Sequence, residues 1–238
     1  MATARLEDEF SDIIGKASRG LRVPLPVLDA GNRAEILRVA AALKLDGAKL
    51  AGIALDGWTP TPKDTGHWGH IAMISSDYGG GIVNCYLQWD DDRTAALFDT
   101  GVDGDAVLRV IAREKLNLAG IFITHGHHDH IEALPEIQRQ HSHAKVRQEG
   151  ASVGRLAISA AKTPGHSADG VTYIVGLVAY VGDSLFAGSV GGANHSYDGL
   201  LRNVRQHILS LPDETLLCPG HGPMTTVAEE KAHNPFFP

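Results

Sequence analysis

The sequence predicts an α/β chain in which a small all-helical segment, residues 1–65, precedes a strand-rich domain, residues 66–238. Two observations lead to this prediction. Apolar residues recur at helical spacing in the first segment, whereas short apolar runs bounded by Gly, Pro or Asp follow one another in the second. Four of these later runs also end close to His or Asp residues, which are common metal ligands. A chain of 238 residues is long enough for one full domain and a small extra one.

The first segment is expected to hold short helices and no strands. Pro24, Pro26 and the stretch 30–32 separate the first two helical patterns, and Asp46-Gly47 separates the next pair. A Pro-rich connection, residues 56–64, marks the boundary with the second domain. The residues at helical spacing are Phe10, Ile13, Ile14 and Ala17; then Ile36, Leu37, Ala40, Ala41 and Leu43; then Leu50, Ile53 and Leu55.

Part of this helical segment resembles bacterial helix-turn-helix repressor domains. Residues 10–21 are similar to the first helix of such a domain, and residues 39–46 to a later one. The chain between them is too short for both the usual second helix and a full recognition helix. Residues 1–66 contain nine Lys or Arg and nine Asp or Glu, so their net charge is zero. Because DNA binding needs a basic face, we interpret the segment as a degenerate module used for packing, dimerisation or covering an active site.

The second domain is expected to begin with a strand meander, after which helices and strands alternate. Glycines at 79–81 and aspartates at 90–92 supply its turns. Strands are predicted near residues 70–75, 82–88, 95–99, 121–124, 154–160, 171–175, 178–182 and 215–218, and helices near 103–115, 131–140, 197–209 and 226–232.

The most informative stretch is Thr124-His125-Gly126-His127-His128-Asp129-His130, which follows the apolar run 121–123. Its H-x-H-x-D-H spacing is typical of a metal site, because neutral imidazoles bind zinc or iron well and a carboxylate balances the charge. His125 and His127 can point to one side of the loop, while Asp129 and His130 can reach a second position.

Three later stretches supply further ligand-type residues. His166 and His221 each lie on a Pro-Gly turn, and Asp183 follows the apolar run 179–181. Each of these turns is a weak signal by itself, because Gly and Pro interrupt many loops. Together with the first motif they give seven ligands, which are too many for one tetrahedral ion and suit two ions that share one carboxylate.

The order of these motifs resembles the metallo-β-lactamase-fold hydrolases, and among them the glyoxalase II-like (hydroxyacylglutathione hydrolase-like) branch. Asp99-Thr100-Gly101 and residues 219–226 are similar to short members of that branch. The resemblance implies a four-layer αββα sandwich and two divalent ions, most often zinc, with iron or manganese as alternatives. It implies that His125, His127 and His166 hold the first ion, that Asp129, His130 and His221 hold the second, and that Asp183 bridges them, with Asp129 and Asp183 as catalytic residues.

Three residues outside the ligand set also have expected roles. Asp99 matches a position just behind the ligands, where it would orient an imidazole; an ordinary turn aspartate is the alternative. His195 and Tyr197 follow a Gly-rich loop after Asp183 and are candidates for substrate contacts. A surface location is an equally good expectation for both.

The resemblance implies an enzyme that hydrolyses a small thioester or related acyl substrate with a hydroxide bridging the two metal ions. Lactone hydrolysis stays open as an alternative. Another is the oxidation of a persulfide or similar thiol-derived substrate by one iron held by two histidines and an aspartate. A third alternative, from a different class, is a regulatory protein in which residues 1–65 bind DNA and the second domain senses a metal or ligand.

Composition excludes several other classes. A net charge of −7 argues against nucleic acid as the main partner. The acidic start lacks the apolar core of a secretory signal, and the longest apolar stretch, residues 171–181, is too short to span a membrane. Cys85 and Cys218 are expected to be small buried thiols, as in a cytoplasmic protein. We therefore expect a soluble cytoplasmic enzyme with a small-molecule substrate; a homodimer stays open.

Overall fold

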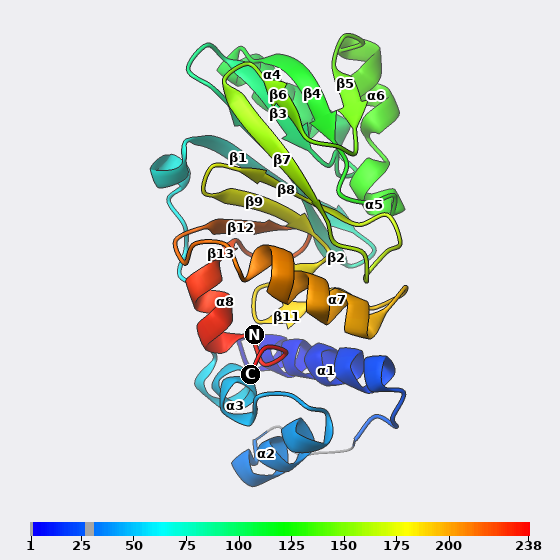
Figure 1. Ribbon diagram of the computed structural model, residues 1–238, viewed down its shortest axis with the longest axis vertical. Coiled ribbons are helices and arrows are strands. Elements are labelled where there is room, and N and C mark those ends of the chain that lie inside the picture. The colour runs from blue at the N-terminus through cyan, green and yellow to red at the C-terminus, as the bar shows by residue number, and fades with distance from the viewer. Residues whose placement is uncertain (1, 27–30) are drawn as a thin grey trace.

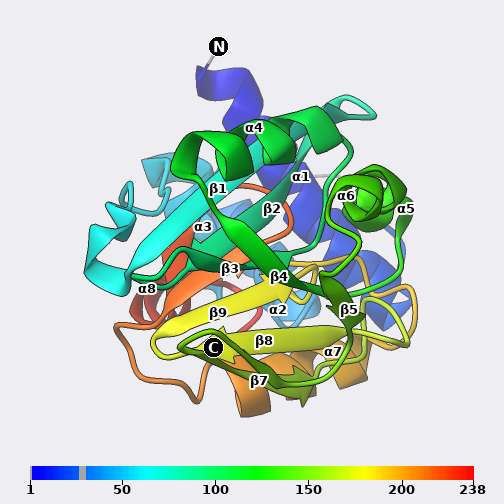
Figure 2. The ribbon, with the colours of Figure 1, turned by 90° about the horizontal axis from the view of Figure 1, so that it is seen from above.

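Two β-sheets face each other and helices cover their outer faces (Figures 1 and 2). The computed structural model describes residues 2–26 and 31–238, and the side chains of that part from residue 8 onward. The predicted four-layer αββα sandwich is therefore confirmed, with a small helical region at the N-terminus.

The first sheet has five strands in the order β1-β2-β3-β4-β5. Its first three strands form an antiparallel meander, and β4 and β5 are added in parallel to β3. Helices α4 and α6 cover its outer face, where they share one apolar cluster with the sheet. The elements are β1 (His70–Tyr78), β2 (Gly81–Trp89), β3 (Thr94–Phe98), α4 (Gly104–Glu114), β4 (Asn117–Phe122), α5 (His128–Ile131), α6 (Leu134–Gln140) and β5 (Lys145–Arg147).

The second sheet has six strands in the order β13-β12-β9-β8-β7-β6. Its strands are antiparallel except that β12 runs parallel to β9. A separate hairpin, β10–β11, follows β9. The elements are β6 (Ala151–Val153), β7 (Leu156–Lys162), β8 (Val171–Val175), β9 (Val178–Gly182), β10 (Leu185–Phe186), β11 (Ser189–Val190), α7 (Tyr197–Asn203), η2 (Val204–Ile208), β12 (Leu216–Pro219), β13 (Thr225–Thr226) and α8 (Val227–His233).

The N-terminal segment contains α1 (Ala2–Leu21), α2 (Arg33–Ala42) and α3 (Gly47–Asp56), as expected, and a short 3-10 turn, η1 (Thr65–Trp68), follows it. In Figure 1, α1 lies beside α7 and α3 lies beside α8, while α2 packs on α3. Buried residues of all three, such as Ile14, Ile36 and Leu50, belong to one apolar cluster with Leu217 of the second sheet. The helices therefore pack directly on the domain that carries the predicted ligands.

Aromatic side chains join the two sheets. The rings of Phe98 and Tyr180 stack with their centroids 3.6 Å apart, and Phe122 and Tyr173 pack beside them. All four side chains are buried. Such large rings bury much apolar surface, and a buried tyrosine also needs a partner for its hydroxyl. Tyr173 donates its hydroxyl to the Ile123 carbonyl, just before the predicted metal loop, and Tyr180 donates its hydroxyl to Gln88 Oε1 of β2.

Several sequence-based element boundaries were wrong. The strand expected at 121–124 is residues 117–122, because Thr124 already donates its backbone N–H to the side chain of Asp99. The helix expected at 131–140 is divided into α5 and α6, and Pro135 lies in the first turn of α6. Strands β5 and β6 were not predicted, because each is three residues long. Leu37 and Leu55, expected on apolar helix faces, are exposed.

Both cysteines are buried free thiols, as predicted. Across the described residues, none of the helices combines the length and the hydropathy needed to cross a membrane. The predicted domain boundary at residue 65 stays a prediction.

Glu230 is a fully buried carboxyl that holds the β10–β11 hairpin to α8. It accepts hydrogen bonds from the backbone N–H of Gly188, from Thr225 Oγ1 and from Asn234 Nδ2. Burial raises the pKa of Glu230 from 4.5 to about 7, even though these donors lower it. Its contribution to stability is therefore fully present below about pH 4.5 and is lost as the pH rises through 7.

We expect the stability of the wild type to fall with pH more steeply than that of Glu230→Gln. Between pH 5.5 and 8.5, the unfolding free energy of the wild type minus that of Glu230→Gln should fall by about 2 kcal/mol, as measured by urea denaturation. The exposed Glu149→Gln should behave as the wild type does. If the unfolding free energies of the wild type and Glu230→Gln changed equally with pH, the raised pKa of Glu230 would be contradicted.

Candidate metal centre

The strand order brings the predicted ligands together at one edge of the sandwich. His125 and His127 follow β4, and His166 follows β7. Asp183 follows β9, and His221 follows β12, the parallel neighbour of β9. Since side chains beyond the carboxyl ends of neighbouring parallel strands lie close together, segments far apart in sequence meet here.

One group of converging ligand atoms consists of His125, His127 and His166. His127 Nδ1 lies 3.0 Å from His125 Nε2 and 2.9 Å from His166 Nε2. Ligand nitrogens about 2.0 Å from one tetrahedral zinc ion lie about 3.3 Å from one another, so the spacing suits a single ion.

A second group consists of Asp129, His130 and His221. Asp129 Oδ2 lies 3.3 Å from His221 Nε2 and 3.8 Å from His130 Nε2. His130 is fully buried, whereas Asp129 and His221 are partly exposed. Two of its three members are thus partly exposed, against one, His127, in the first group, so this group is the more open to solvent.

Asp183 lies between the two groups. Its Oδ1 atom is 3.3 Å from His130 Nε2, and its Oδ2 atom is 3.5 Å from His166 Nε2 and 3.4 Å from His221 Nε2. One carboxylate thus faces histidines of both groups.

The donor set fits divalent metal ions. Within the described part of the chain, His130 Nε2 and Asp183 Oδ1 are buried and make no hydrogen bond, although such atoms are normally paired. Gly220 leaves room beside them, because a Cβ there would lie 2.4 Å from Asp183 Oδ1 and 2.5 Å from a carbon of the His130 ring. Imidazole and carboxylate ligands in this number indicate a divalent metal site.

The other nitrogen of each of three imidazoles is already held by the protein. His130 Nδ1 donates to Asp99 Oδ2 at 2.8 Å, His166 Nδ1 to the Gly192 carbonyl at 2.7 Å, and His221 Nδ1 to the Ile82 carbonyl at 2.6 Å. In all three rings Nε2 is left to face the centre. Such outer contacts fix the tautomer and the orientation of metal-binding histidines.

The cluster strongly shifts the titration of its members in the metal-free protein. Burial lowers the pKa of His125 to about 4 and also lowers that of His166. Burial acts in the same direction on His130, but the carboxylates of Asp99 and Asp183 outweigh it and raise its pKa to about 11. His130 and His221 hold the pKa of Asp183 well below its usual range despite its burial. The buried carboxylate is therefore ionised, as a metal ligand must be.

The sequence did not indicate some of the residues that position the loops carrying the ligands. Tyr173 donates its hydroxyl to the Ile123 carbonyl, just before the H-x-H-x-D-H loop, and Asp169 accepts the backbone N–H of Gly126 inside that loop.

Tyr86 and Asn84 similarly bind backbone atoms of the loop that carries His221. Tyr86 Oη and Asn84 Nδ2 donate to the Pro219 carbonyl, and Asn84 Nδ2 also donates to that of Gly222. These contacts join residues distant in sequence, so no local motif indicates them.

The two residues proposed for substrate contact lie outside the ligand groups. His195 is exposed, and its backbone N–H donates to the Gly165 carbonyl. The ring of Tyr197 lies against Gly20 of α1, where even a Cβ would lie 2.3 Å from it. Tyr197 thus packs on the N-terminal helices, with its apolar ring on a residue that has no side chain.

One further sequence pattern has no catalytic setting. Residues 150–154 have the spacing Gly-x-Ser-x-Gly, which on a strand-to-helix turn marks a nucleophilic serine. Ser152 instead lies exposed in the short edge strand β6.

Replacement of Asp99 by asparagine should weaken metal binding. Asp99 has φ of +56° and holds three groups, since it also accepts the Thr124 N–H and the Thr124 hydroxyl, each at 2.7 Å. An amide keeps the shape but supplies one acceptor oxygen instead of two. We expect a loss of about 10- to 100-fold in metal affinity, measured by competition with a chelator, as is usual for such outer contacts. Affinity equal to that of the wild type would show that Asp99 is only a turn residue.

Comparison with known proteins agrees with this fold. The sequence model of the family described as the metallo-beta-lactamase superfamily matches residues 78–151. The probable metallo-hydrolase YqgX of Bacillus subtilis is 30% identical over 197 residues, which cover 65% of this chain and 92% of that protein. The chain belongs to the metallo-beta-lactamase superfamily.

Within the superfamily, its homologues include hydroxyacylglutathione hydrolases. The enzyme of that name from Haemophilus influenzae, GloC, is 28% identical over 65% of this chain and 92% of its own. Two solved structures are also similar. ETHE1 from Myxococcus xanthus is 29% identical, with a TM-score of 0.62 over 69% of this chain and 83% of that one. TTHA1623 in a di-iron-bound form is 25% identical, with a TM-score of 0.60 over 69% of this chain and 100% of that one.

Proposed function

We propose that this protein hydrolyses small thioesters at a centre of two divalent metal ions. The position of Asp183 supports this proposal more than any other observation. A carboxylate whose two oxygens lie 3.3 to 3.5 Å from histidines of both ligand groups suits a shared ligand of two ions. Two-metal centres of this kind are common in hydrolases.

In this proposal His125, His127 and His166 would hold one ion, and Asp129, His130 and His221 would hold the other. When bound, such ions would lower the pKa of a bound water molecule and polarise the carbonyl of the substrate. The protein keeps the ligands in place. Asp99 retains the proton at Nδ1 of His130, so that Nε2 of the buried ring is free to act as a ligand.

The named relatives support the same reaction class. GloC is named as a hydroxyacylglutathione hydrolase, an enzyme that cleaves a thioester, and TTHA1623 binds two iron ions in its di-iron form. The partly exposed group with Asp129 and His221 would face the substrate.

A second candidate is oxidation of a persulfide at a single iron. The group of Asp129, His130 and His221, and equally the buried group of His125, His130 and Asp183, consists of two histidines and one carboxylate. This is the ligand set of many non-haem iron oxygenases.

The two functions can be separated with one set of protein samples. Metal-free protein is reconstituted with zinc, manganese or ferrous iron and tested on a neutral acyl thioester, S-lactoylglutathione, a lactone and glutathione persulfide with an oxygen electrode. We expect metal-dependent cleavage of a thioester without oxygen uptake. Oxygen uptake with the persulfide and no thioester cleavage would favour the second candidate, and no reaction with any substrate would contradict both.

A further inference from the structure

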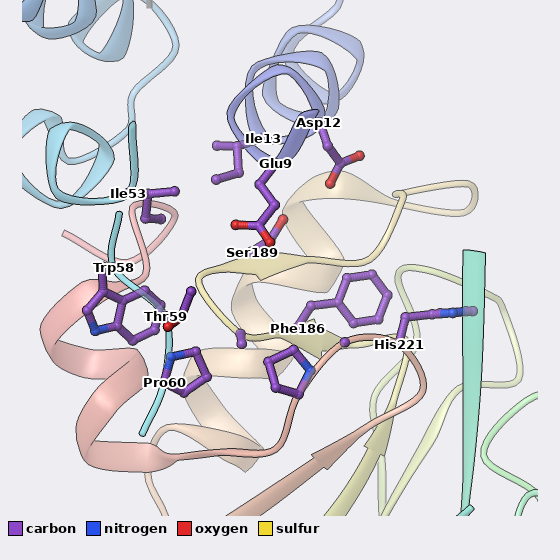
Figure 3. A pocket seen from close by; sticks show the side chains of 13 residues that line it. Glu9, Asp12, Ile13, Ile53, Trp58, Thr59, Pro60, Phe186, Ser189 and His221 are labelled. Atoms are coloured by element: carbon purple, nitrogen blue, oxygen red, sulfur yellow. The ribbon is translucent and has the colours of Figure 1, made fainter. Parts of the chain in front are cut away.

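A cavity of about 350 Å³ runs from the second ligand group of the metal centre to the N-terminal helices (Figure 3). His221 lines one end, and the ring of Phe186 packs edge-on against its imidazole with centroids 5.5 Å apart. Ile53 of α3 and Trp58, in the connection that follows α3, line the other end. In Figure 3 His221 and Trp58 lie on opposite sides of the cavity. We call this cavity the helix-covered pocket.

Apolar side chains make up more than half of the lining of the helix-covered pocket. In Figure 3 Phe186, Pro60 and Trp58 follow one another from the side of His221 to the far end, and Ile13 lies above them. Each methylene group that a ligand buries against such walls raises its affinity about fourfold. The walls therefore favour a hydrocarbon chain that extends from the metal centre toward Trp58.

The carboxylates of the lining, Glu9 and Asp12, belong to α1 and lie to one side of this apolar run. Asp12 is paired with Lys16 at 2.5 Å. The same ammonium group lies 3.4 Å from Ser189 Oγ and 4.7 Å above the Phe186 ring. The charge of Asp12 is therefore balanced within the wall, and the contacts of Lys16 join α1 to the β10–β11 hairpin.

The far end of the helix-covered pocket is closed by an aromatic ring that neighbouring elements hold in place. The Trp58 ring stacks on His233 of α8 with centroids 4.5 Å apart. Gly188, in the hairpin that carries Phe186, lies so close to Trp58 that a Cβ there would be 2.9 Å from the indole. Glu230 accepts the N–H of the same glycine. Trp58 is thus a fixed end wall, and a preformed pocket binds at a lower cost in entropy.

The volume of the helix-covered pocket limits the length of a chain that fits. On the scale of a cavity of about 150 Å³ that holds the six carbon atoms of benzene, about 350 Å³ has room for about fourteen at most. A flexible chain fills a cavity less completely than a ring, so we expect the limit between about ten and fourteen carbon atoms.

We propose that the helix-covered pocket binds a hydrocarbon chain of the substrate and that Trp58 sets the longest chain that fits. This inference rests on the proposed function, because it takes the metal centre as the place of reaction. The chain belongs either to the acyl group or to the thiol, since both extend from the reacting carbonyl carbon. In either case residues 1–65 would help to cover the active site, which is one of the roles that the sequence left open.

Chain length in the wild type is the direct test. One series consists of N-acetylcysteamine thioesters whose acyl groups have two to sixteen carbon atoms, and the other of S-alkyl thioacetates with alkyl groups of the same lengths. In at least one series kcat/KM should rise about twofold or more per methylene and stop rising between about ten and fourteen carbon atoms. The series that shows the rise identifies the part of the substrate that enters the pocket. A kcat/KM that does not rise with chain length in either series would contradict the proposal.

Two variants change the helix-covered pocket in opposite directions and leave every metal ligand in place. Trp58→Ala removes the end wall, so kcat/KM for the sixteen-carbon substrate relative to the eight-carbon one should increase about 10-fold. Ala187→Leu extends a partly exposed lining residue into the cavity, so kcat/KM for the ten-carbon substrate relative to the four-carbon one should fall about 10-fold.

Trp68→Ala is a matched control for Trp58→Ala. Trp68 is also partly exposed but does not line the pocket, so both ratios should stay within about twofold of the wild type. Circular dichroism and thermal unfolding show whether each variant is folded, and Ala187→Leu alone decides if Trp58→Ala is not. Unchanged ratios in the folded variants would contradict the proposal.

A binding measurement separates failure of this inference from failure of the proposed function. The neutral fluorophore N-phenyl-1-naphthylamine should bind the wild type and Trp68→Ala, and bind Ala187→Leu about 10-fold more weakly. If the wild type cleaves thioesters without a rise with chain length, the pocket assignment is wrong and the function stands. If no thioester is cleaved, the function is wrong, and fluorophore binding alone decides: weaker binding by Ala187→Leu supports the pocket, and equal binding contradicts it.

Discussion

Asp183→Asn is expected to lower kcat for thioester hydrolysis by about 1,000-fold or more, because loss of a shared metal ligand should exceed the 10- to 100-fold effect of an outer contact. Asparagine has the same shape, so the packing beside Gly220 is kept. It carries no charge, however, and only one of its two terminal atoms can act as a ligand. The ligand groups on either side of Asp183 would then lose the carboxylate between them, and we expect at most one tightly bound ion per chain.

The loss of activity and of metal in Asp183→Asn must be distinguished from misfolding of the variant. Asp105 in α4 is an exposed aspartate away from the centre, so Asp105→Asn is a suitable control that should keep both activity and metal. Circular dichroism should give the same spectrum for the wild type and both variants, because the aromatic core between the sheets is untouched. Turnover by Asp183→Asn within about tenfold of the wild type, at equal metal content, would contradict a bridging role.

Removal of metal with a chelator is expected to abolish activity and to lower stability. Ions that bind only the folded chain stabilise it by about 3 kcal/mol when their free concentration is 100 times Kd. Their loss also leaves His130 Nε2 and Asp183 Oδ1 buried, with only their mutual contact of 3.3 Å in place of a metal ion. Thermal unfolding with and without chelator, followed by restoration with zinc, manganese or iron, measures both effects. Full activity after exhaustive dialysis against a chelator would show that the reaction needs no metal.

The same experiment has an expected pH dependence. The carboxylates of Asp99 and Asp183 raise the pKa of His130 to about 11 against the effect of burial, so the metal-free protein holds a proton there at neutral pH. Metal binding must displace that proton. Metal affinity should therefore decrease as the pH falls, and titration calorimetry in buffers of different ionisation enthalpy should detect proton release. An affinity that is constant between pH 6 and 8 would contradict this.

The features that could be predicted from the sequence are those set by residues close together in the chain. His125, His127, Asp129 and His130 lie within one loop, so their spacing alone indicated ligands. The strand before each later ligand was also visible, because its apolar run ended at a Gly or Pro. Short strands such as β5 carry too few residues to show any periodicity.

Other parts were not predictable, because they depend on tertiary contacts. The hydroxyl of Tyr173 reaches a carbonyl 50 residues away, and nothing near Tyr173 in the sequence indicates this. Similarly, the sequence left open whether residues 1–65 pack, dimerise or cover a site. Only the folded chain places Ile13 and Ile53 in a cavity that His221 also lines.

Metal content per chain tests the central claim most directly. Protein expressed in rich medium should be measured by inductively coupled plasma mass spectrometry, with Asp183→Asn alongside it. The bridged centre predicts close to two ions per wild-type chain and at most one in the variant. A single iron ion per fully active wild-type chain, unchanged by Asp183→Asn, would contradict the bridged centre.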